Sequence, residues 1–144
     1  MADARWSSAL LLLITCGSSL VLTACSDHPE AVAKRLIGKW QCTTQTIIYA
    51  DRKEENLNPG LRVEFLADGS YQAAQGQATS RGTYKVIDVH HYTYQVTQSD
   101  HGEQVGRSGT TEFSVLADQL QVLVPGQGKE SPAIKRIETT CQRQ

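Results

Sequence analysis

The residues of this chain with the most specific chemistry are its four cysteines, Cys16, Cys25, Cys42 and Cys141. A cysteine thiolate can attack an alkyl group, bind a metal ion or form a disulfide, so the spacing of the cysteines decides among these reactions. The chain contains no C-x-x-C pair and no cluster of cysteine with histidine. The pattern therefore does not favour a metal or redox centre, and acylation and disulfide formation remain to be considered.

The histidines and carboxylates match no known type of catalytic motif. His90 and His91 are adjacent, and neighbours in a strand point to opposite faces, so the two cannot easily share one metal ion. His101 lies in a nearby predicted turn and could join one of them in a metal site, but no carboxylate spacing supports such a site. Glu54 and Glu55 fall in the polar segment 51–58, which we expect to be a solvated loop. Because G-x-S-x-G, H-E-x-x-H and phosphate-loop spacings are also missing, we expect no catalytic residues, no metal, no cofactor and no enzymatic activity.

The composition indicates one globular domain and gives no electrostatic reason for binding nucleic acid. The chain has 144 residues, of which 40% are hydrophobic and 20% are charged, as expected for a packed core. Its formal net charge is −1, and its lysines and arginines are scattered among acidic residues. Binding to the phosphates of nucleic acid requires clustered basic residues, so we exclude a nucleic-acid partner.

The N-terminal segment has the pattern of an export signal. Apolar runs at residues 9–14 and 20–22 flank five small or polar residues, and the single basic residue before them is Arg5. A secretory signal combines a basic start, a short apolar core and a small-residue cleavage site. The interrupted stretch is too short and too polar in its middle for a membrane-spanning helix, which needs about 20 apolar residues.

The sequence Leu22-Thr23-Ala24-Cys25 resembles the lipobox of bacterial lipoprotein precursors. The resemblance implies cleavage before Cys25, lipidation of its thiol and attachment of the mature chain to a membrane. It divides the chain into a signal peptide (1–24), a lipidated tether with the start of a helix (25–34) and a folded domain (35–144). Ser26 after the cysteine favours the outer membrane, facing the periplasm. The alternatives are an ordinary signal cleaved near Ala24 and an uncleaved anchor.

The lipobox leaves Cys42 and Cys141 as the candidate disulfide. Cys16 would leave with the signal and Cys25 would carry lipid, while the periplasm is oxidising enough for the remaining two cysteines to pair. We therefore predict a Cys42–Cys141 disulfide in the exported protein.

After a short helix, the chain changes to a period-two pattern. His28 or Asp27 can cap the helix, Pro29 suits its first position and Gly38 can end it. Eight later runs alternate apolar and polar residues and are rich in β-branched and aromatic types. These runs are 40–48, 61–65, 71–75, 82–87, 92–97, 111–115, 120–124 and 134–141. We predict an all-β antiparallel meander closed into an eight-stranded barrel, with a β-sandwich as the alternative.

Several motifs in these strands resemble small bacterial lipocalin-like domains. They are G-x-W at Gly38–Trp40, the Asp68-Gly69 turn between Phe65 and Tyr71, G-x-Y at Gly82–Tyr84, and Asp118-x-Leu120. In that family the tryptophan packs under one end of the barrel beside an N-terminal helix. The resemblance therefore implies that Trp40 is buried against residues 33–37.

Two functions are compatible with such a domain. A barrel open at one end could bind a small apolar or amphipathic ligand, and a filled barrel with an exposed apolar or tyrosine-rich patch could dock an envelope protein as an inhibitor, pilot or assembly factor. Tyr71 also falls on the predicted strands, where tyrosines serve either packing or a pocket. The candidate ligand-binding residues are Trp40, Phe65, Tyr84, Tyr92, Tyr94 and Phe113, with Val63, Val86 and Val122 as further lining of an internal cavity.

Overall fold

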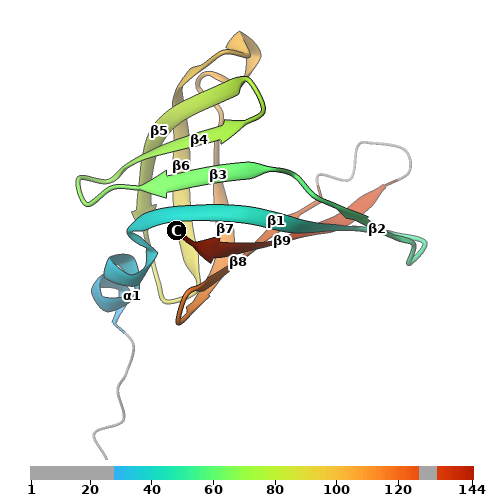
Figure 1. The fold of residues 1–144 in the computed structure, drawn as a ribbon, viewed down its shortest axis with the longest axis horizontal. Helices are drawn as coiled ribbons and strands as arrows, with labels where there is room; N and C mark the ends of the chain where they lie inside the picture. Colours follow the sequence, from blue (N-terminus) through green and yellow to red (C-terminus); the bar gives the residue numbers. More distant parts are fainter. Residues whose placement is uncertain (1–27, 127–132) are drawn as a thin grey trace, which may run out of the picture.

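The computed structural model describes residues 28–126 and 133–144. The predicted signal peptide and lipobox, including Cys25, lie outside the described residues. Within the described part, the chain forms one α-helix, nine strands and a short 3₁₀ turn (Figure 1). No helix in that part is long and apolar enough to cross a membrane.

The helix α1, Pro29–Leu36, forms where the sequence pattern predicts it. Pro29 occupies the first turn and Glu30 complements the positive end of the helix dipole, while His28 takes the capping position without a side-chain hydrogen bond. Val32 and Leu36 are buried and fix the helix against one end of the barrel. The helix runs without a break across the boundary between residues 34 and 35, where the predicted tether ends and the predicted folded domain begins.

The strands form one antiparallel sheet whose order follows the sequence. They are β1 (Gly38–Tyr49), β2 (Glu54–Leu57), β3 (Leu61–Phe65), β4 (Ser70–Gln75), β5 (Ala78–Val86), β6 (His91–Ser99), β7 (Ser108–Leu116), β8 (Gln119–Pro125) and β9 (Ile134–Arg143). Strands β1 and β3 to β9 each pair with the next, and β1 also pairs with β9, which closes an eight-stranded barrel. The predicted eight-stranded meander barrel is confirmed, and the sandwich alternative is not adopted.

Strand β2 is an addition that the sequence pattern missed. Residues 51–58 were expected to be a solvated loop, but Glu54–Leu57 pair with Gln45–Ile48 of β1. All four β2 residues are exposed, so the segment lacks the alternating burial that makes a strand visible in a sequence. It forms because β1 is 12 residues long and its second half runs past β3, leaving an edge for pairing. Figure 1 shows this three-stranded extension of β1, β2 and β9 on the right.

The barrel is closed by a disulfide as well as by hydrogen bonds. Cys42 lies directly opposite Cys141 in the β1–β9 pairing, and the two sulfur atoms are bonded. The predicted Cys42–Cys141 disulfide is thus confirmed. Both residues are about 1% exposed, so the bridge belongs to the core.

Trp40 joins the helix to the closed end of the barrel, which we call the base. Its side chain is fully buried, and its indole N–H donates a 2.8 Å hydrogen bond to the Leu36 carbonyl. The Arg143 guanidinium lies 4.2 Å from the centre of the ring and donates hydrogen bonds to the carbonyls of Arg35 and Ile37. The free carbonyls at the end of α1 are thus satisfied by the last strand.

Replacement of Trp40 by alanine should lower the free energy of unfolding by about 3–5 kcal/mol, because a large buried side chain is lost and a cavity remains. W40F is the matched variant: it keeps an aromatic ring but removes the hydrogen bond to Leu36, and should cost less. Urea unfolding followed by circular dichroism measures both values. A W40A variant as stable as the wild type would show that the helix does not depend on this side chain.

Candidate functional site

A pocket of about 210 Å³ with an uncharged lining lies inside the barrel. Its walls come from strands β3, β4, β6, β7 and β8. The lining residues are Val63, Phe65, Tyr71, Ala73, Tyr92, Tyr94, Thr111, Val122 and Val124. None of them is charged, and the pocket is partly open to solvent. Its volume exceeds the ~150 Å³ of an engineered apolar cavity that binds benzene, so a small apolar molecule fits.

Phe65 and Tyr92 connect this pocket to the packed core. The two rings meet edge to face with centres 5.7 Å apart, and each also contacts an aromatic residue outside the pocket lining. Phe65 packs against Tyr84 at 4.9 Å and Tyr92 packs against Phe113 at 5.3 Å. Edge-to-face contacts of this kind are favourable for aromatic rings. Phe65 and Tyr92 are therefore held by packing on the core side of the pocket.

The predicted site residues divide into two groups. Phe65, Tyr92 and Tyr94 line the pocket, together with Val63 and Val122 from the wider predicted lining. Trp40, Tyr84 and Phe113 do not line it, and neither does Val86. Trp40 and Phe113 are buried in the core, and the Tyr84 hydroxyl donates a hydrogen bond to the Leu66 carbonyl in the β3–β4 turn.

Trp40, Tyr84, Val86 and Phe113 were expected in the pocket because the alternation of apolar and polar residues shows which face of the sheet a side chain occupies. It does not show how far along the barrel the side chain lies. Tyr71, which the sequence assigned either to packing or to a pocket, also lines it, and Ala73, Thr111 and Val124 complete the lining and were not predicted. The inward alternation of their strands could have found them, since each is two residues from another inward residue on the same strand.

Two glycines make room for the pocket tyrosines. A Cβ atom on Gly109 would lie 3.2 Å from the Tyr94 hydroxyl oxygen, because the ring lies across the paired strand. A Cβ atom on Gly82 would lie 2.7 Å from the Tyr71 ring and would collide with the Gln95 carbonyl. Gly82 also follows an irregularity in the β5–β6 pairing. Gly82 therefore excludes larger residues by space, while a side chain at Gly109 would require the Tyr94 ring to shift slightly.

The Tyr92 phenol is the most strongly perturbed group of the pocket. Burial raises its pKa well above the ordinary value, and the nearby Tyr94 and Tyr71 phenols add to this effect. The Thr111 hydroxyl donates a hydrogen bond to the phenol oxygen, which offsets part of the shift. Burial also raises the pKa of the Tyr71 phenol. At neutral pH the pocket therefore presents uncharged hydroxyl groups on an apolar wall.

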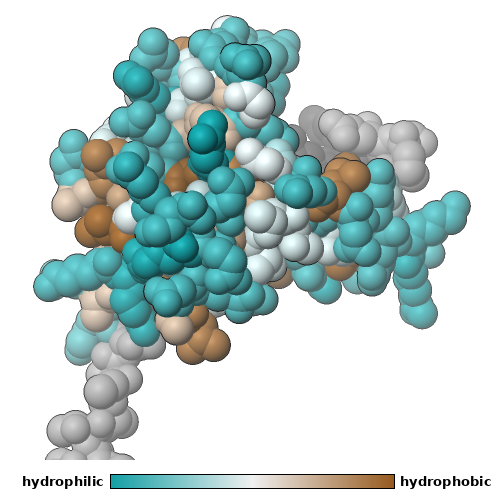
Figure 2. Space-filling view, in the orientation of Figure 1, coloured by the Kyte–Doolittle hydropathy of each residue, from teal (hydrophilic) through white to brown (hydrophobic). Residues whose placement is uncertain are grey.

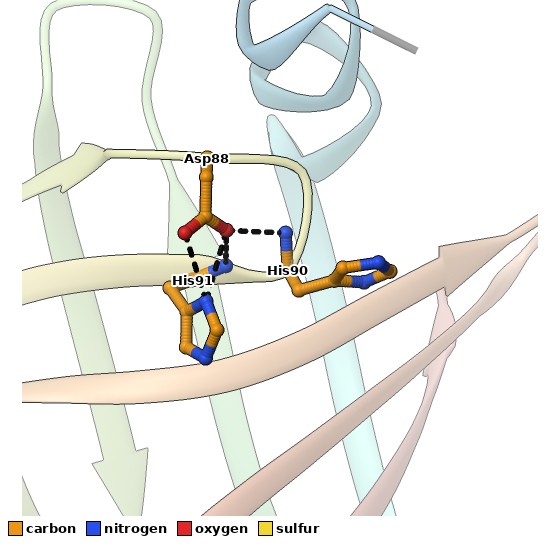
Figure 3. Close-up of polar contacts among 3 residues, drawn as sticks. All are labelled: Asp88, His90 and His91. Atoms are coloured by element: carbon orange, nitrogen blue, oxygen red, sulfur yellow. Dashed lines mark hydrogen bonds and ion pairs between the residues drawn. The ribbon is translucent and has the colours of Figure 1, made fainter. Parts of the chain in front are cut away.

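The two adjacent histidines lie outside this pocket, in the β5–β6 turn (Figure 3). The Asp88 carboxylate accepts hydrogen bonds from the backbone N–H groups of His90 and His91, both at 2.8 Å, and lies 2.9 Å from Nδ1 of His91. These bonds lower the pKa of Asp88, the one from His90 most strongly. The hydrogen bonds of Asp88 with His90 and His91 stabilise the conformation of the turn. Across residues 28–126 and 133–144, no three metal-ligating side chains come together as a metal site.

The Tyr92 environment predicts a loss of stability at alkaline pH. The folded protein holds the phenol proton more tightly than the unfolded chain, so the contribution of Tyr92 to stability is complete below the ordinary pKa of about 10 and falls as the pH rises above it. Y92F removes this titration while keeping the ring. Urea unfolding across this pH range should show a weaker pH dependence for Y92F than for the wild type. Equal slopes would mean that Tyr92 is not buried as a neutral phenol.

Comparisons with known proteins support the fold and leave the function open. No family model matches the sequence, and no curated protein matches it. Among solved structures, the chain is similar to a lipocalin-like protein from Bacteroides uniformis ATCC 8492, with a TM-score of 0.51 and 16% sequence identity. The match covers 76% of this chain and 99% of that one. The described domain therefore has a lipocalin-like fold.

Proposed function

We propose that this chain is a lipid-anchored protein of the bacterial envelope whose barrel binds a small apolar or amphipathic ligand without catalysing a reaction. The observation that carries the ligand-binding part is the uncharged pocket inside the barrel. Ligand pockets are typically lined by apolar and aromatic side chains with a few polar groups that orient the ligand. The anchoring part depends on the lipobox at Cys25 and its resemblance to lipoprotein precursors.

The pocket chemistry defines the ligand class. Val63, Ala73, Val122 and Val124 supply aliphatic contacts, and the phenols with Thr111 supply hydroxyl groups. A charged ligand group would lose its hydration without gaining an opposite charge from the lining, so the buried part of the ligand must be neutral. A short aliphatic or aromatic body with one hydroxyl, carbonyl or similar group satisfies both features.

The second candidate function, docking of an envelope protein, is favoured by apolar side chains at the open end. Leu57 on β2 and Val124 at the end of β8 are exposed. The tyrosines do not form the exposed patch that this function predicted, since Tyr71 and Tyr92 are buried and Tyr84 and Tyr94 are half-buried. Val124 also lines the pocket, so its exposure does not require a protein partner, and we favour ligand binding.

Filling the pocket tests ligand binding. In the pairing of β3 with β4, Ala73 lies opposite Val63, and both line the pocket. A73F should fill the cavity and weaken binding of an amphipathic probe such as octanol by at least about tenfold, or 1.4 kcal/mol. Ala74 is the adjacent residue and points to the opposite face, so A74F is the matched control and should bind as the wild type does. Titration calorimetry measures the three affinities.

Either of two results would contradict this site. Octanol could fail to bind the wild-type protein, or A73F and A74F could bind it equally well. Native mass spectrometry of protein purified from its own host then reports whether a small molecule or a protein accompanies the chain, which separates the two candidate functions.

Lipidation is tested at the cysteine itself. Cells given a palmitate analogue should label the wild-type protein, and C25S should remain unlabelled and unprocessed because the thiol is the acyl acceptor. C16S is the control, since Cys16 lies in the segment to be removed, and should be labelled normally. An unlabelled wild type in the membrane or periplasmic fraction would favour the ordinary signal or the uncleaved anchor instead.

A further inference from the structure

The base of the barrel carries apolar side chains that the fold leaves uncovered. Because the strands alternate in direction, the start of β1 and the ends of β3, β5, β7 and β9 all lie at this end, next to α1. Ile87 in the β5–β6 turn is 48% exposed, and Leu116 at the end of β7 is 77% exposed. Figure 2 shows the brown tip of the β7–β8 hairpin at the bottom of the molecule, in the orientation of Figure 1.

Leu116 is not needed for packing or for its turn. The inward residues of β7 are Thr111, Phe113 and Val115, so Leu116 lies on the outer face of the hairpin. The neighbouring Ala117 supplies the left-handed backbone of the turn, with a φ of 50°. A polar side chain would be equally stable at this solvent-exposed position. Leu116 and Ile87 together offer apolar surface at the base that a contact would remove from water.

The sequence also places the anchor close to this end. Three residue steps separate Cys25 from His28, which precedes the first residue of α1. An extended chain of that length spans at most about 10 Å. The polar region on each side of a bilayer is roughly 5–8 Å thick. A lipid on Cys25 would therefore hold the start of α1, and the base beside it, against the headgroups.

The charges at the base oppose neither neutral nor anionic lipid. The exposed charges there are balanced: Lys34, Arg35, Lys39 and Lys85 are basic, and Glu30, Asp68, Asp88 and Asp118 are acidic. Electrostatic attraction therefore does not select the lipid, and the apolar tips define the contact.

We propose that the base is the membrane-contact surface of this protein, with Leu116 and Ile87 inserted among the lipid headgroups. The inference rests on the lipid anchor proposed above. The pocket then extends away from the supporting membrane, because its lining reaches Val124 near the end of β8, which runs away from the base. A ligand would enter from the aqueous side and not from the lipid beneath the protein.

Tryptophan scanning of the full lipidated protein tests this orientation. L116W places a tryptophan at the base, and V105W places one at the opposite end, where Val105 follows the 3₁₀ turn Gly102–Gln104 and is 48% exposed. Both variants keep the buried Trp40 as a common background. They are reconstituted in vesicles of phosphatidylethanolamine and phosphatidylglycerol that contain brominated phospholipid, which quenches nearby tryptophan.

We expect L116W emission to shift to shorter wavelength on reconstitution and to lose intensity to the brominated lipid, while V105W changes little. Protein that floats with the vesicles but shows equal quenching at both positions, or stronger quenching of V105W, would overturn the orientation alone. If the protein floats with the vesicles, shows no quenching at either position and cross-links as a dimer through the base, then a second copy of the chain covers this surface and the membrane contact is overturned. Protein that carries no lipid and does not float would overturn the anchor and this inference together.

Discussion

Pairing between the first and last strands is the constraint on which the rest of the molecule depends. β1 and β9 are separated by most of the chain, yet they form a ladder from Trp40–Arg143 to Tyr49–Ile134, interrupted by irregularities after Cys42 and after Ile48. This ladder closes the sheet and leaves no free edge around the barrel. The disulfide lies inside the ladder and restricts the unfolded chain, so contacts of long sequence separation cost less entropy to form. The ladder also brings Arg143 to Trp40 and to the end of the helix.

The same closure divides the interior into a packed end and an open end. At the base, Trp40, Leu36, Phe113 and Leu120 are almost fully buried and leave no room for a ligand. Further along the barrel, Ala73 and Thr111 occupy inward positions with small side chains, and the space they leave becomes the pocket. Phe65 and Tyr92 contribute to both regions. The stability of the base and the shape of the pocket are thus coupled through two aromatic residues.

Arg143 shows how the chain ends support one another. Its guanidinium stacks on Trp40, donates hydrogen bonds to the last carbonyls of α1 and lies 3.5 Å from Asp118 in the β7–β8 turn. One side chain near the C-terminus therefore holds the helix, the tryptophan and a hairpin that carries the exposed Leu116. In the proposed orientation these elements together form the membrane side of the protein.

Local patterns in the sequence determined much of this protein. Alternation of apolar and polar residues predicted all eight barrel strands, and Pro29 and Gly38 predicted the helix. The Asp68-Gly69 turn also forms as its residues indicate, since Gly69 adopts a φ of 83° and Asp68 accepts hydrogen bonds from Ser70. The cysteines and G-x-W indicated closure and the buried tryptophan. Each of these signals is local or depends on a residue type with few alternatives.

Tertiary structure alone decided which inward residues line the pocket and where β1 leaves the barrel. Trp40, Tyr84 and Phe113 alternate inward like Tyr92, and only the register between strands shows that they sit in the packed base. Strand β2 forms because the second half of β1 offers an unpaired edge, not because Glu54–Leu57 favour a strand. Position along a barrel and availability of an edge depend on contacts between distant segments, and no short window of sequence contains that information.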